Sequence, residues 1–238
     1  MSDACRTPEQ LVAGLRETRK RMDRAAEAAG RDAADVALVA VSKRHPAQSV
    51  RTLAQTGQMD FGENYVQEAL SKQQELKDLA LRWHFIGHLQ SNKAKLLPGA
   101  FALFHGLDSL KLARALDSAC RAMGETLSVL VQVNVAQEEQ KSGIDEGGLP
   151  ELVRETAAMP GLNLQGLMVM PPWNPDPEAS RPHFARLFAL RERLRDDLGL
   201  ALPHLSMGMS HDLEVAVSEG ATLVRAGTCV FGPRPAAG

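Results

Sequence analysis

Short apolar runs alternate with longer amphipathic stretches along most of the chain. The run at 36–41 is apolar at every position, which is typical of a strand in a parallel sheet with both faces covered. Apolar residues recur at helical spacing between Phe184 and Leu198 and predict an amphipathic helix. We predict strands at 36–41, 59–61, 83–86, 102–107, 127–134, 164–169, 203–207 and 222–226. We predict helices near 47–57, 64–79, 91–97, 109–123, 145–158, 178–198 and 210–219.

A further helix precedes the first strand. Thr7 is a suitable cap, Pro8 stands at the first helical position, and Gln10 stands at the third. An apolar stripe follows at helical spacing, formed by Leu11, Leu15, Met22 and Ala26. Gly30 is expected to end this helix.

Eight strand–helix units in about 200 residues predict a (β/α)₈ (TIM) barrel with an extra N-terminal helix. An open doubly wound sheet is the alternative, but the glycine-rich nucleotide fingerprint expected after its first strand is missing. The only loop-like cluster spans 170–177, and no linker interrupts the chain. We therefore expect a single domain over residues 1–238.

Composition excludes several classes of protein. Of the 238 residues, 44% are hydrophobic, and 27 basic residues nearly balance 29 acidic ones, so we expect no nucleic-acid partner. The three cysteines are widely spaced and form neither a disulfide framework nor a zinc site. Without an apolar run of membrane-spanning length or a signal-peptide pattern, we expect a soluble cytoplasmic protein that does not bind membranes.

Unusual polar residues follow the carboxyl ends of the predicted strands, which share one rim in a barrel. Lys43 comes directly after the first strand. A lysine that is partly removed from water is more easily deprotonated, and its neutral amine can form a Schiff base with an aldehyde. Many strands, however, end in a solvated lysine, so this residue alone is a weak signal.

A phosphate site is predicted after the seventh and eighth strands, where barrels often bind phosphate. Gly208 and Gly227 would let the backbone approach an anion, and hydroxyls come from Ser206, Ser210 and Thr228. Ser210 is also placed to cap a helix that starts at His211. Each glycine taken alone is better explained as a tight turn and each serine as a cap. The set together predicts an anion site.

A lysine and a phosphate site on one rim predict a ligand with both an aldehyde and a phosphate. Pyridoxal 5'-phosphate fits this description, and so does the sugar phosphate of a Schiff-base aldolase. Arg225 favours the first, because a guanidinium facing a pyridine nitrogen cannot accept a proton and keeps that nitrogen unprotonated. The ring is then a poor electron sink. The alternative for Arg225 is a salt bridge at the rim.

Several segments resemble the pyridoxal phosphate homeostasis protein family. They are VAVSK (39–43), FGENYVQE (61–68), WHFIGHLQSNK (83–93), LSMGMS (205–210) and VRAGTCVFG (224–232). That family has the barrel of the amino-terminal domain of alanine racemase, whose Arg-x-Gly-x-x-x-aromatic-Gly ending is similar to 225–232. The resemblance implies the following cofactor-binding residues: Lys43 as the Schiff-base lysine, Arg225 opposite the pyridine nitrogen, Ser206, Gly227, Thr228 and Ser210 around the phosphate, and Asn64 beside the ring.

The resemblance also implies a function in vitamin B6 and amino-acid homeostasis without an established reaction. The chain departs from the family pattern in two places. Arg44 and His45 stand where smaller residues are frequent, and Gly106 stands where serine is common. Both departures are expected to flank the pocket and to alter cofactor release. We further expect a monomer that contacts pyridoxal phosphate-dependent apo-enzymes transiently.

A small single-domain amino-acid racemase is the alternative function. A racemase needs acid/base groups on both faces of its substrate. Alanine racemase takes one of them from a tyrosine in a carboxyl-terminal domain, which we expect to be missing here, and Tyr65 would most simply pack at a helix start. His84, His88 and His105 could act as bases, although a histidine in a barrel is more often a hydrogen-bonded structural residue. A carrier is therefore the preferred hypothesis.

Overall fold

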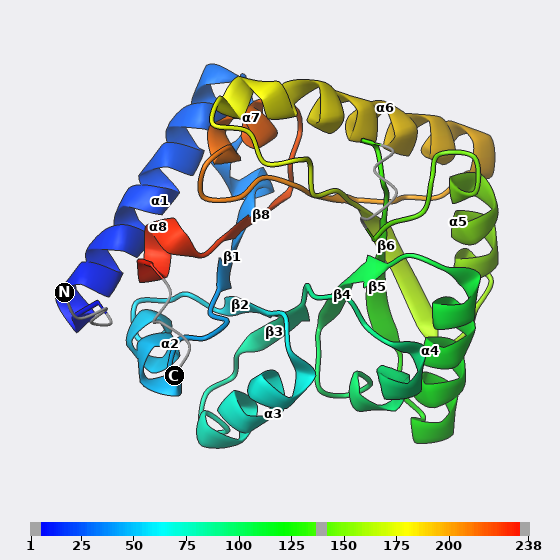
Figure 1. The fold of residues 1–238 in the computed structure, drawn as a ribbon, viewed down its shortest axis with the longest axis horizontal. Helices are drawn as coiled ribbons and strands as arrows, with labels where there is room; N and C mark the ends of the chain where they lie inside the picture. Colours follow the sequence, from blue (N-terminus) through cyan, green and yellow to red (C-terminus); the bar gives the residue numbers. More distant parts are fainter. Residues whose placement is uncertain (1–5, 137–141, 234–238) are drawn as a thin grey trace.

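The computed structural model describes residues 6–136 and 142–233. Eight parallel strands close into a barrel in the order of the sequence, and helices surround it (Figure 1). The strands are β1 (Ala37–Val41), β2 (Asp60–Glu63), β3 (Arg82–Phe85), β4 (Leu103–Leu107), β5 (Leu127–Gln132), β6 (Leu162–Met168), β7 (His204–Ser206) and β8 (Leu223–Ala226). The closed barrel confirms the predicted fold and excludes the open sheet.

The helices follow the strands as expected, with three differences. The α-helices are α1 (Pro8–Ala28), α2 (Ala47–Ala54), α3 (Val66–Glu75), α4 (Leu110–Met123), α5 (Leu149–Ala157), α6 (Arg181–Leu198), α7 (Leu213–Ser218) and α8 (Thr228–Phe231). The segment near 91–97 is a 3₁₀ helix (Ser91–Leu96) rather than an α-helix. α7 starts at Leu213 rather than at 210, and the short helix α8 was not predicted. Four residues are too few to produce a helical periodicity.

The opening helix α1 begins as its sequence predicts. The Thr7 side chain accepts a hydrogen bond from the backbone N–H of Gln10, and the Gln10 side chain accepts one from the backbone N–H of Thr7. This reciprocal pair satisfies two amides that would otherwise lack partners. Gly30 follows the helix with a φ of 67°, a left-handed conformation that glycine adopts without strain.

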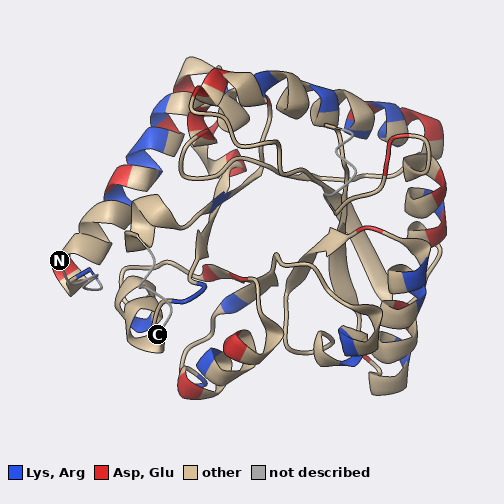
Figure 2. Cartoon of the chain, in the orientation of Figure 1, with Lys and Arg blue, Asp and Glu red and all other residues tan. Residues whose placement is uncertain are grey.

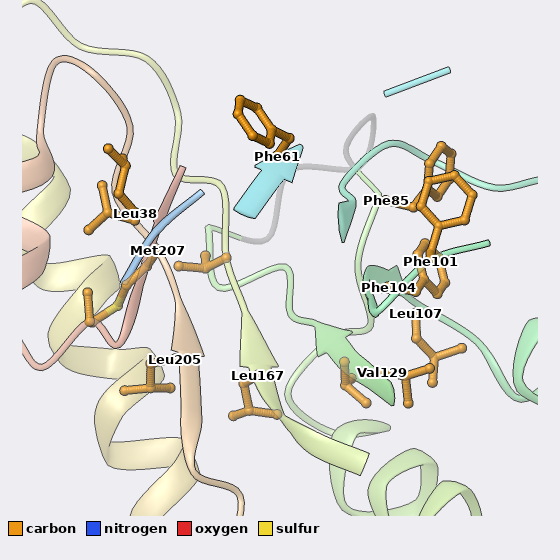
Figure 3. Close-up of a cluster of buried hydrophobic side chains, with 14 of the residues drawn as sticks. Leu38, Phe61, Phe85, Phe101, Phe104, Leu107, Val129, Leu167, Leu205 and Met207 are labelled. Carbon is orange, nitrogen blue, oxygen red and sulfur yellow. The ribbon is translucent and has the colours of Figure 1, made fainter. Parts of the chain in front are cut away.

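Strand alternation divides the apolar residues between two sides of the barrel wall. A large core lies between strands and helices, and Figure 3 shows part of it, with Phe85 packed against Phe101 and Phe104. The Phe85 ring centroid lies 5.4 Å from that of Phe101 and 5.7 Å from that of Phe104. A smaller apolar cluster forms apart from this core, from Val39, Leu103, Leu130, Met168 and Leu223. Polar side chains therefore have to share the barrel interior with this second cluster.

Closure places the first and last strands side by side. β1 pairs with β2 on one side, with Val41 opposite Gly62, and with β8 on the other, with Ala40 opposite Ala226. The segments that carry Lys43, Asn64 and Gly227 therefore leave the barrel next to one another. Charges of both signs lie along the outer helix α1, whereas α6 carries basic residues along its length and acidic residues near its end (Figure 2). Among the described residues, no helix is long and apolar enough to cross a membrane.

Candidate functional site

A cavity of about 350 Å³ opens at the carboxyl ends of the strands. It is lined by Val41, Lys43, His45, Asn64, Ile86, Met170, Trp173, Met209, Ser210, His211, Arg225, Gly227, Thr228 and Gly232. Six of the seven predicted site residues are in this set, and Ser206 is the exception. The structure thus brings together an amine, a guanidinium, two hydroxyls and backbone amides from the carboxyl ends of β1, β7 and β8.

Lys43 is half-buried at the cavity wall, and the backbone before it is fixed by a buried ionic group that we name the Lys72 cluster. In this cluster, Lys72 Nζ donates to the Ser42 carbonyl, to Glu63 Oε1 and to Glu68 Oε1, each at 2.7 Å. Ser42 Oγ also donates to Glu63 Oε1 at 2.7 Å. The lysine side chain thereby connects β1, β2 and α3 directly behind Lys43.

Glu63 is the buried carboxylate of the Lys72 cluster, with none of its surface exposed. Burial raises the pKa of its carboxyl group, and the charge and hydrogen bond of Lys72 together with the Ser42 hydroxyl oppose that rise. Its Oε2 atom is buried without a hydrogen-bond partner within the described ranges. The buried carboxylate of Glu63 is costly to ionise, and among the described residues Lys72 is the cation that balances it. The same Lys72 side chain holds the loop that carries Lys43.

The two residues after Lys43 differ in location. Arg44 is exposed and has a φ of 65°, a left-handed conformation that is strained for a residue other than glycine. His45 is buried and lines the cavity, where its ring stacks on Phe231 with centroids 5.0 Å apart. The departure at 44–45 therefore does reach the cavity.

The location of Gly106 differs from the one expected from the sequence. It is buried in β4, and it is not among the residues that line the cavity. A Cβ atom at this position would lie 2.9 Å from the Gly87 carbonyl oxygen and 3.1 Å from the Phe104 ring. The absence of a side chain at 106 thus serves close packing in the barrel wall rather than the cavity, and the expectation that it flanks the pocket was wrong.

Backbone amides and hydroxyls converge on one side of the cavity. Ser210 Oγ accepts hydrogen bonds from the backbone N–H groups of Gly227 and Cys229, both at 3.2 Å. The expectation that Ser210 caps a helix starting at His211 was therefore wrong, because α7 begins later, after Asp212, and Ser210 binds the start of α8 instead. A Cβ at Gly227 would lie 3.3 Å from the Val41 carbonyl oxygen, so a larger residue would crowd β1.

The same short helix α8 is held from its other side by the beginning of the chain. Arg6 Nη1 donates to the carbonyl oxygens of Cys229 at 2.9 Å and Val230 at 2.8 Å. α8 packs against α1, as Figure 1 shows. Ser210 and Arg6 together fix the start of α8, where Gly227 and Thr228 line the cavity.

Arg225 forms the floor of the cavity and is 3% exposed. Its Nη1 donates to Ser206 Oγ at 2.5 Å, and its Nη2 donates to the Val169 carbonyl at 2.9 Å. Burial lowers the pKa of Arg225 to about 10, and the charge of Asp212 partly opposes this shift. The guanidinium therefore remains protonated near neutral pH.

Ser206, which was expected near the phosphate, is completely buried beneath the cavity. Its hydroxyl contacts Arg225 and also His105, whose Nδ1 lies 2.8 Å from Ser206 Oγ. The structure thus places Ser206 against the guanidinium, away from the Ser210 hydroxyl and the amides of α8. Strand alternation explains the location, because the neighbours Leu205 and Met207 belong to the outer core.

Asn64 carries the clearest signal of a missing ligand. It lines the cavity, and its Oδ1 atom is buried without a hydrogen-bond partner in the part of the chain that the structure describes. Buried polar atoms are almost always paired. An aromatic ligand with a polar substituent near this atom would satisfy it, so the residues present fit a phosphorylated aromatic aldehyde.

Of the three histidines considered as bases, two are buried inside the barrel and one is exposed. As expected, His84 and His105 are hydrogen-bonded to each other, with 2.9 Å between His84 Nδ1 and His105 Nε2, and neither lines the cavity. The His88 side chain is 58% exposed and lies 3.6 Å from Asp108. None of these three histidines is placed to act on a ligand in the cavity.

Sequence reasoning missed the aromatic and methionine residues at the cavity mouth. Met170 and Trp173 belong to the proline-rich segment that we expected to be a surface loop. Trp173 is 76% exposed, and its ring lies over that of His211 with centroids 6.4 Å apart. A tryptophan within a loop of prolines was the available signal.

Comparison with known proteins agrees with this geometry. Residues 15–235 match the family model of the alanine racemase N-terminal domain. The pyridoxal phosphate homeostasis protein of Pseudomonas aeruginosa is 48% identical over 224 residues, covering 94% of this chain and 96% of that protein. The protein of the same name from Aquifex aeolicus is 45% identical over 215 residues, covering 90% and 94%.

Solved structures are similar as well. A structure of PipY from Synechococcus elongatus with PLP bound has 39% identity and a TM-score of 0.78, covering 83% of this chain and 93% of that chain. An alanine racemase from Clostridium difficile has 14% identity and a TM-score of 0.75, covering 96% of this chain and 58% of that chain. The second similarity shows the shared barrel fold alone.

Proposed function

This chain belongs to the pyridoxal phosphate homeostasis protein family, and we propose that it holds pyridoxal 5'-phosphate in the cavity above Arg225 for buffering or delivery. The observation that carries the proposal is that Lys43, Arg225 and the Ser210 hydroxyl with its two amides share one cavity of about 350 Å³. A phosphorylated aldehyde on a basic aromatic ring has one group for each of these features.

We assign a role to each predicted site residue that lines the cavity. The Lys43 amine would condense with the aldehyde carbon as a Schiff base, and the aldehyde oxygen would leave as water. Arg225 would face the pyridine nitrogen and, being only a donor, would keep it unprotonated. The Ser210 and Thr228 hydroxyls would donate to the phosphate, beside the Gly227 amide that holds Ser210 in place. Asn64 provides its unpaired Oδ1 beside the ring. When bound, the cofactor supplies an electron-withdrawing ring for amino-acid chemistry.

Ser206 has a different role in this proposal from the one expected of it. Its hydroxyl is already engaged by Arg225 and His105, and it has no exposed surface. We therefore assign it to the support of Arg225 rather than to the phosphate.

We favour a carrier over a racemase because of the groups that face the cavity. Two histidines line it, and both are engaged: His45 stacks on Phe231, and His211 Nε2 lies 3.1 Å from the Pro175 carbonyl. The single tyrosine, Tyr65, lies at the start of α3, where it is 58% exposed and outside the cavity lining. A second acid/base group opposite Lys43 is therefore missing from the cavity lining that the structure describes.

Delivery requires contact with the acceptor protein. Met170 and Trp173 are exposed at the cavity mouth and offer an apolar rim for a transient contact with apo-enzymes. We propose that the protein works as a cytoplasmic monomer, which light scattering of the purified protein tests directly.

The test of the proposal is spectroscopic. Mixing the protein with pyridoxal 5'-phosphate should give a yellow adduct, and reduction with borohydride followed by mass spectrometry should place it on Lys43. Lys43→Ala should abolish the adduct, while Lys93→Ala, which removes an exposed lysine, should keep it. An adduct on another amine, or none, contradicts the proposal.

Two further outcomes separate the alternative functions. Deuterium exchange at the α-carbon of amino acids in the presence of the cofactor would identify a racemase. A sugar phosphate trapped on Lys43 in preference to pyridoxal 5'-phosphate would identify an aldolase. A carrier shows neither.

A further inference from the structure

A continuous series of hydrogen bonds crosses the interior of the barrel from the cavity floor to the opposite end. We name it the interior network, and its members are Arg225, Ser206, His105, His84 and Asp60. The last contact joins His84 Nε2 to Asp60 Oδ1 at 3.0 Å. Asp60 is the first residue of β2 and forms an ion pair with Arg82. The network thus spans the barrel between two charged ends.

The two ends determine the direction of the terminal hydrogen bonds. A guanidinium has only N–H groups, so Arg225 donates to Ser206 Oγ. At the other end, burial favours the neutral form of Asp60, but hydrogen bonds from His84 and Arg82 outweigh it and lower the pKa of Asp60 to about 2. Asp60 is therefore an ionised acceptor, and His84 Nε2 carries a proton.

The neutral form of His105 determines the direction of the hydrogen bonds between Arg225 and Asp60. His105 has no exposed surface, and its burial together with the nearby His84, Arg225 and His204 lowers its pKa well below the ordinary value. A neutral imidazole has one donor and one acceptor nitrogen. The Ser206 hydroxyl hydrogen needs an acceptor, and His105 Nδ1 lies 2.8 Å away. His105 Nε2 is then the donor, and it donates to His84 Nδ1.

We propose that each hydrogen bond of the interior network is donated in the direction of Asp60. We further propose that His105 and His84 are positioning residues that fix Arg225 at the cavity floor. This inference deepens the proposed function and rests on it for the identity of the ligand. In this arrangement the Ser206 hydroxyl and every ring nitrogen of His105 and His84 have a partner, and each imidazole donates from Nε2 and accepts at Nδ1.

The network also explains how a buried arginine is held without a carboxylate in direct contact with it. Among the described residues, Arg225 forms no ion pair, and its hydrogen-bond acceptors are a hydroxyl and a carbonyl. A carboxylate next to Arg225 would lie near the pyridine nitrogen and favour its protonation. The network instead places the negative charge of Asp60 at the far end of the barrel. Arg225 thereby keeps a positive charge toward the ring, as a weak electron sink requires.

The first experiment reads the protons directly on the cofactor-free protein. Long-range ¹H–¹⁵N NMR spectra of histidine-labelled protein distinguish the two tautomers and the charged form, and His84→Gln and His105→Gln assign the signals. We expect Nε2–H neutral rings for both residues at pH 7 to 8. A proton on His105 Nδ1, or a doubly protonated His84, overturns the proposal, whether or not the protein binds the cofactor.

The second experiment tests the effect on the cavity. Ser206→Ala should weaken pyridoxal 5'-phosphate binding about tenfold, the equivalent of one buried hydrogen bond, and shift the absorption maximum of the adduct. Ser206→Thr keeps the hydroxyl and should restore both properties. His204→Gln is the matched control, because His204 is half-buried nearby but contacts Thr222 instead of the network.

The outcomes separate the two proposals. Unchanged affinity and spectrum in Ser206→Ala overturn the positioning role. A Ser206→Thr variant that behaves like Ser206→Ala does the same, because the hydroxyl is then not what matters. Failure of the wild-type protein to form an adduct on Lys43 contradicts the proposed function instead, and the tautomers still report on the network.

Discussion

The Lys72 cluster and the interior network are two buried polar groups in one barrel, and they handle charge in opposite ways. In the Lys72 cluster, opposite charges touch, with 2.7 Å between Lys72 Nζ and Glu63 Oε1. In the interior network, neutral side chains separate the guanidinium of Arg225 from the carboxylate of Asp60. The first arrangement holds a loop in place, and the second keeps a carboxylate away from the cavity floor. The negative charge therefore lies in contact with the cation in the Lys72 cluster and far from the cation in the interior network.

The largest effect is expected where a touching charge pair is broken. Lys72→Met leaves the Glu63 carboxylate buried without a counter-ion and should lower the free energy of unfolding by about 3–5 kcal/mol. Urea denaturation followed by circular dichroism measures the change. The double variant Glu63→Gln/Lys72→Met removes both charges and should recover part of the loss. A loss below about 1 kcal/mol in the single variant would contradict the buried ion pair.

A smaller loss is expected from the interior network, because replacing Ser206 removes a neutral hydroxyl and breaks no ion pair. Ser206→Ala removes the shared partner of Arg225 and His105 and should lower the free energy of unfolding by about 1–3 kcal/mol. The same denaturation experiment applies. Ser118→Ala on the exposed face of α4 is the control and should change little. Equal stabilities of the two variants would show that Ser206 is not hydrogen-bonded as described.

The pH dependence of stability should have opposite signs in the two groups. The pKa of Asp60 is lowered to about 2, so the unfolded state binds more protons than the folded state between about pH 2 and 4, and stability is lost as pH falls through this window. The pKa of Glu63 is raised, chiefly by burial, so its contribution is lost as pH rises above about 4. Asp60→Asn should flatten the acid limb of the stability curve, and Glu63→Gln should remove the decline above it. Parallel changes in both variants would contradict the comparison.

The smallest effect is expected at the solvent edge of the Lys72 cluster. The Glu68 side chain is 25% exposed, and its Oε1 accepts hydrogen bonds from Lys72 and from the backbone N–H of Arg44. Glu68→Gln keeps an acceptor oxygen and should cost about 0.3–1 kcal/mol. Thermal unfolding of this variant beside Lys72→Met checks the order. A loss as large as that of Lys72→Met would place the stabilising charge on Glu68 rather than Glu63.

The sequence predicts the barrel well because its signal is periodic. The apolar run at 36–41 and the amphipathic stretch from Phe184 to Leu198 both became elements close to their predicted bounds, β1 and α6. Errors fall on short segments. The helix predicted near 91–97 is a 3₁₀ helix, and the short helix α8 has only four residues. Such segments contain too few residues for a period to be recognised.

The cavity was predictable as far as strand ends determine it. Lys43, Asn64 and Gly227 follow β1, β2 and β8, and closure of the barrel makes these strands neighbours. Ser206 was predicted with Ser210 as one of the hydroxyls around the phosphate, and the structure places its hydroxyl against His105 and Arg225. The interior network joins β2, β3, β4, β7 and β8, and no local pattern in the sequence reports contacts between strands so far apart in the chain.

The contact between Arg6 and α8 has a consequence for the synthesis of this protein. Arg6 binds the carbonyl oxygens of Cys229 and Val230, more than 220 positions further along the chain. While a nascent chain emerges from the ribosome, Lys43 leaves the exit tunnel early, but the guanidinium of Arg225 and the amides of α8 leave it much later. Cofactor binding must therefore follow the contact between Arg6 and α8, which forms only after β8 and α8 have been translated. A ribosome-stalled fragment that ends before β8 should expose Lys43 without retaining the cofactor.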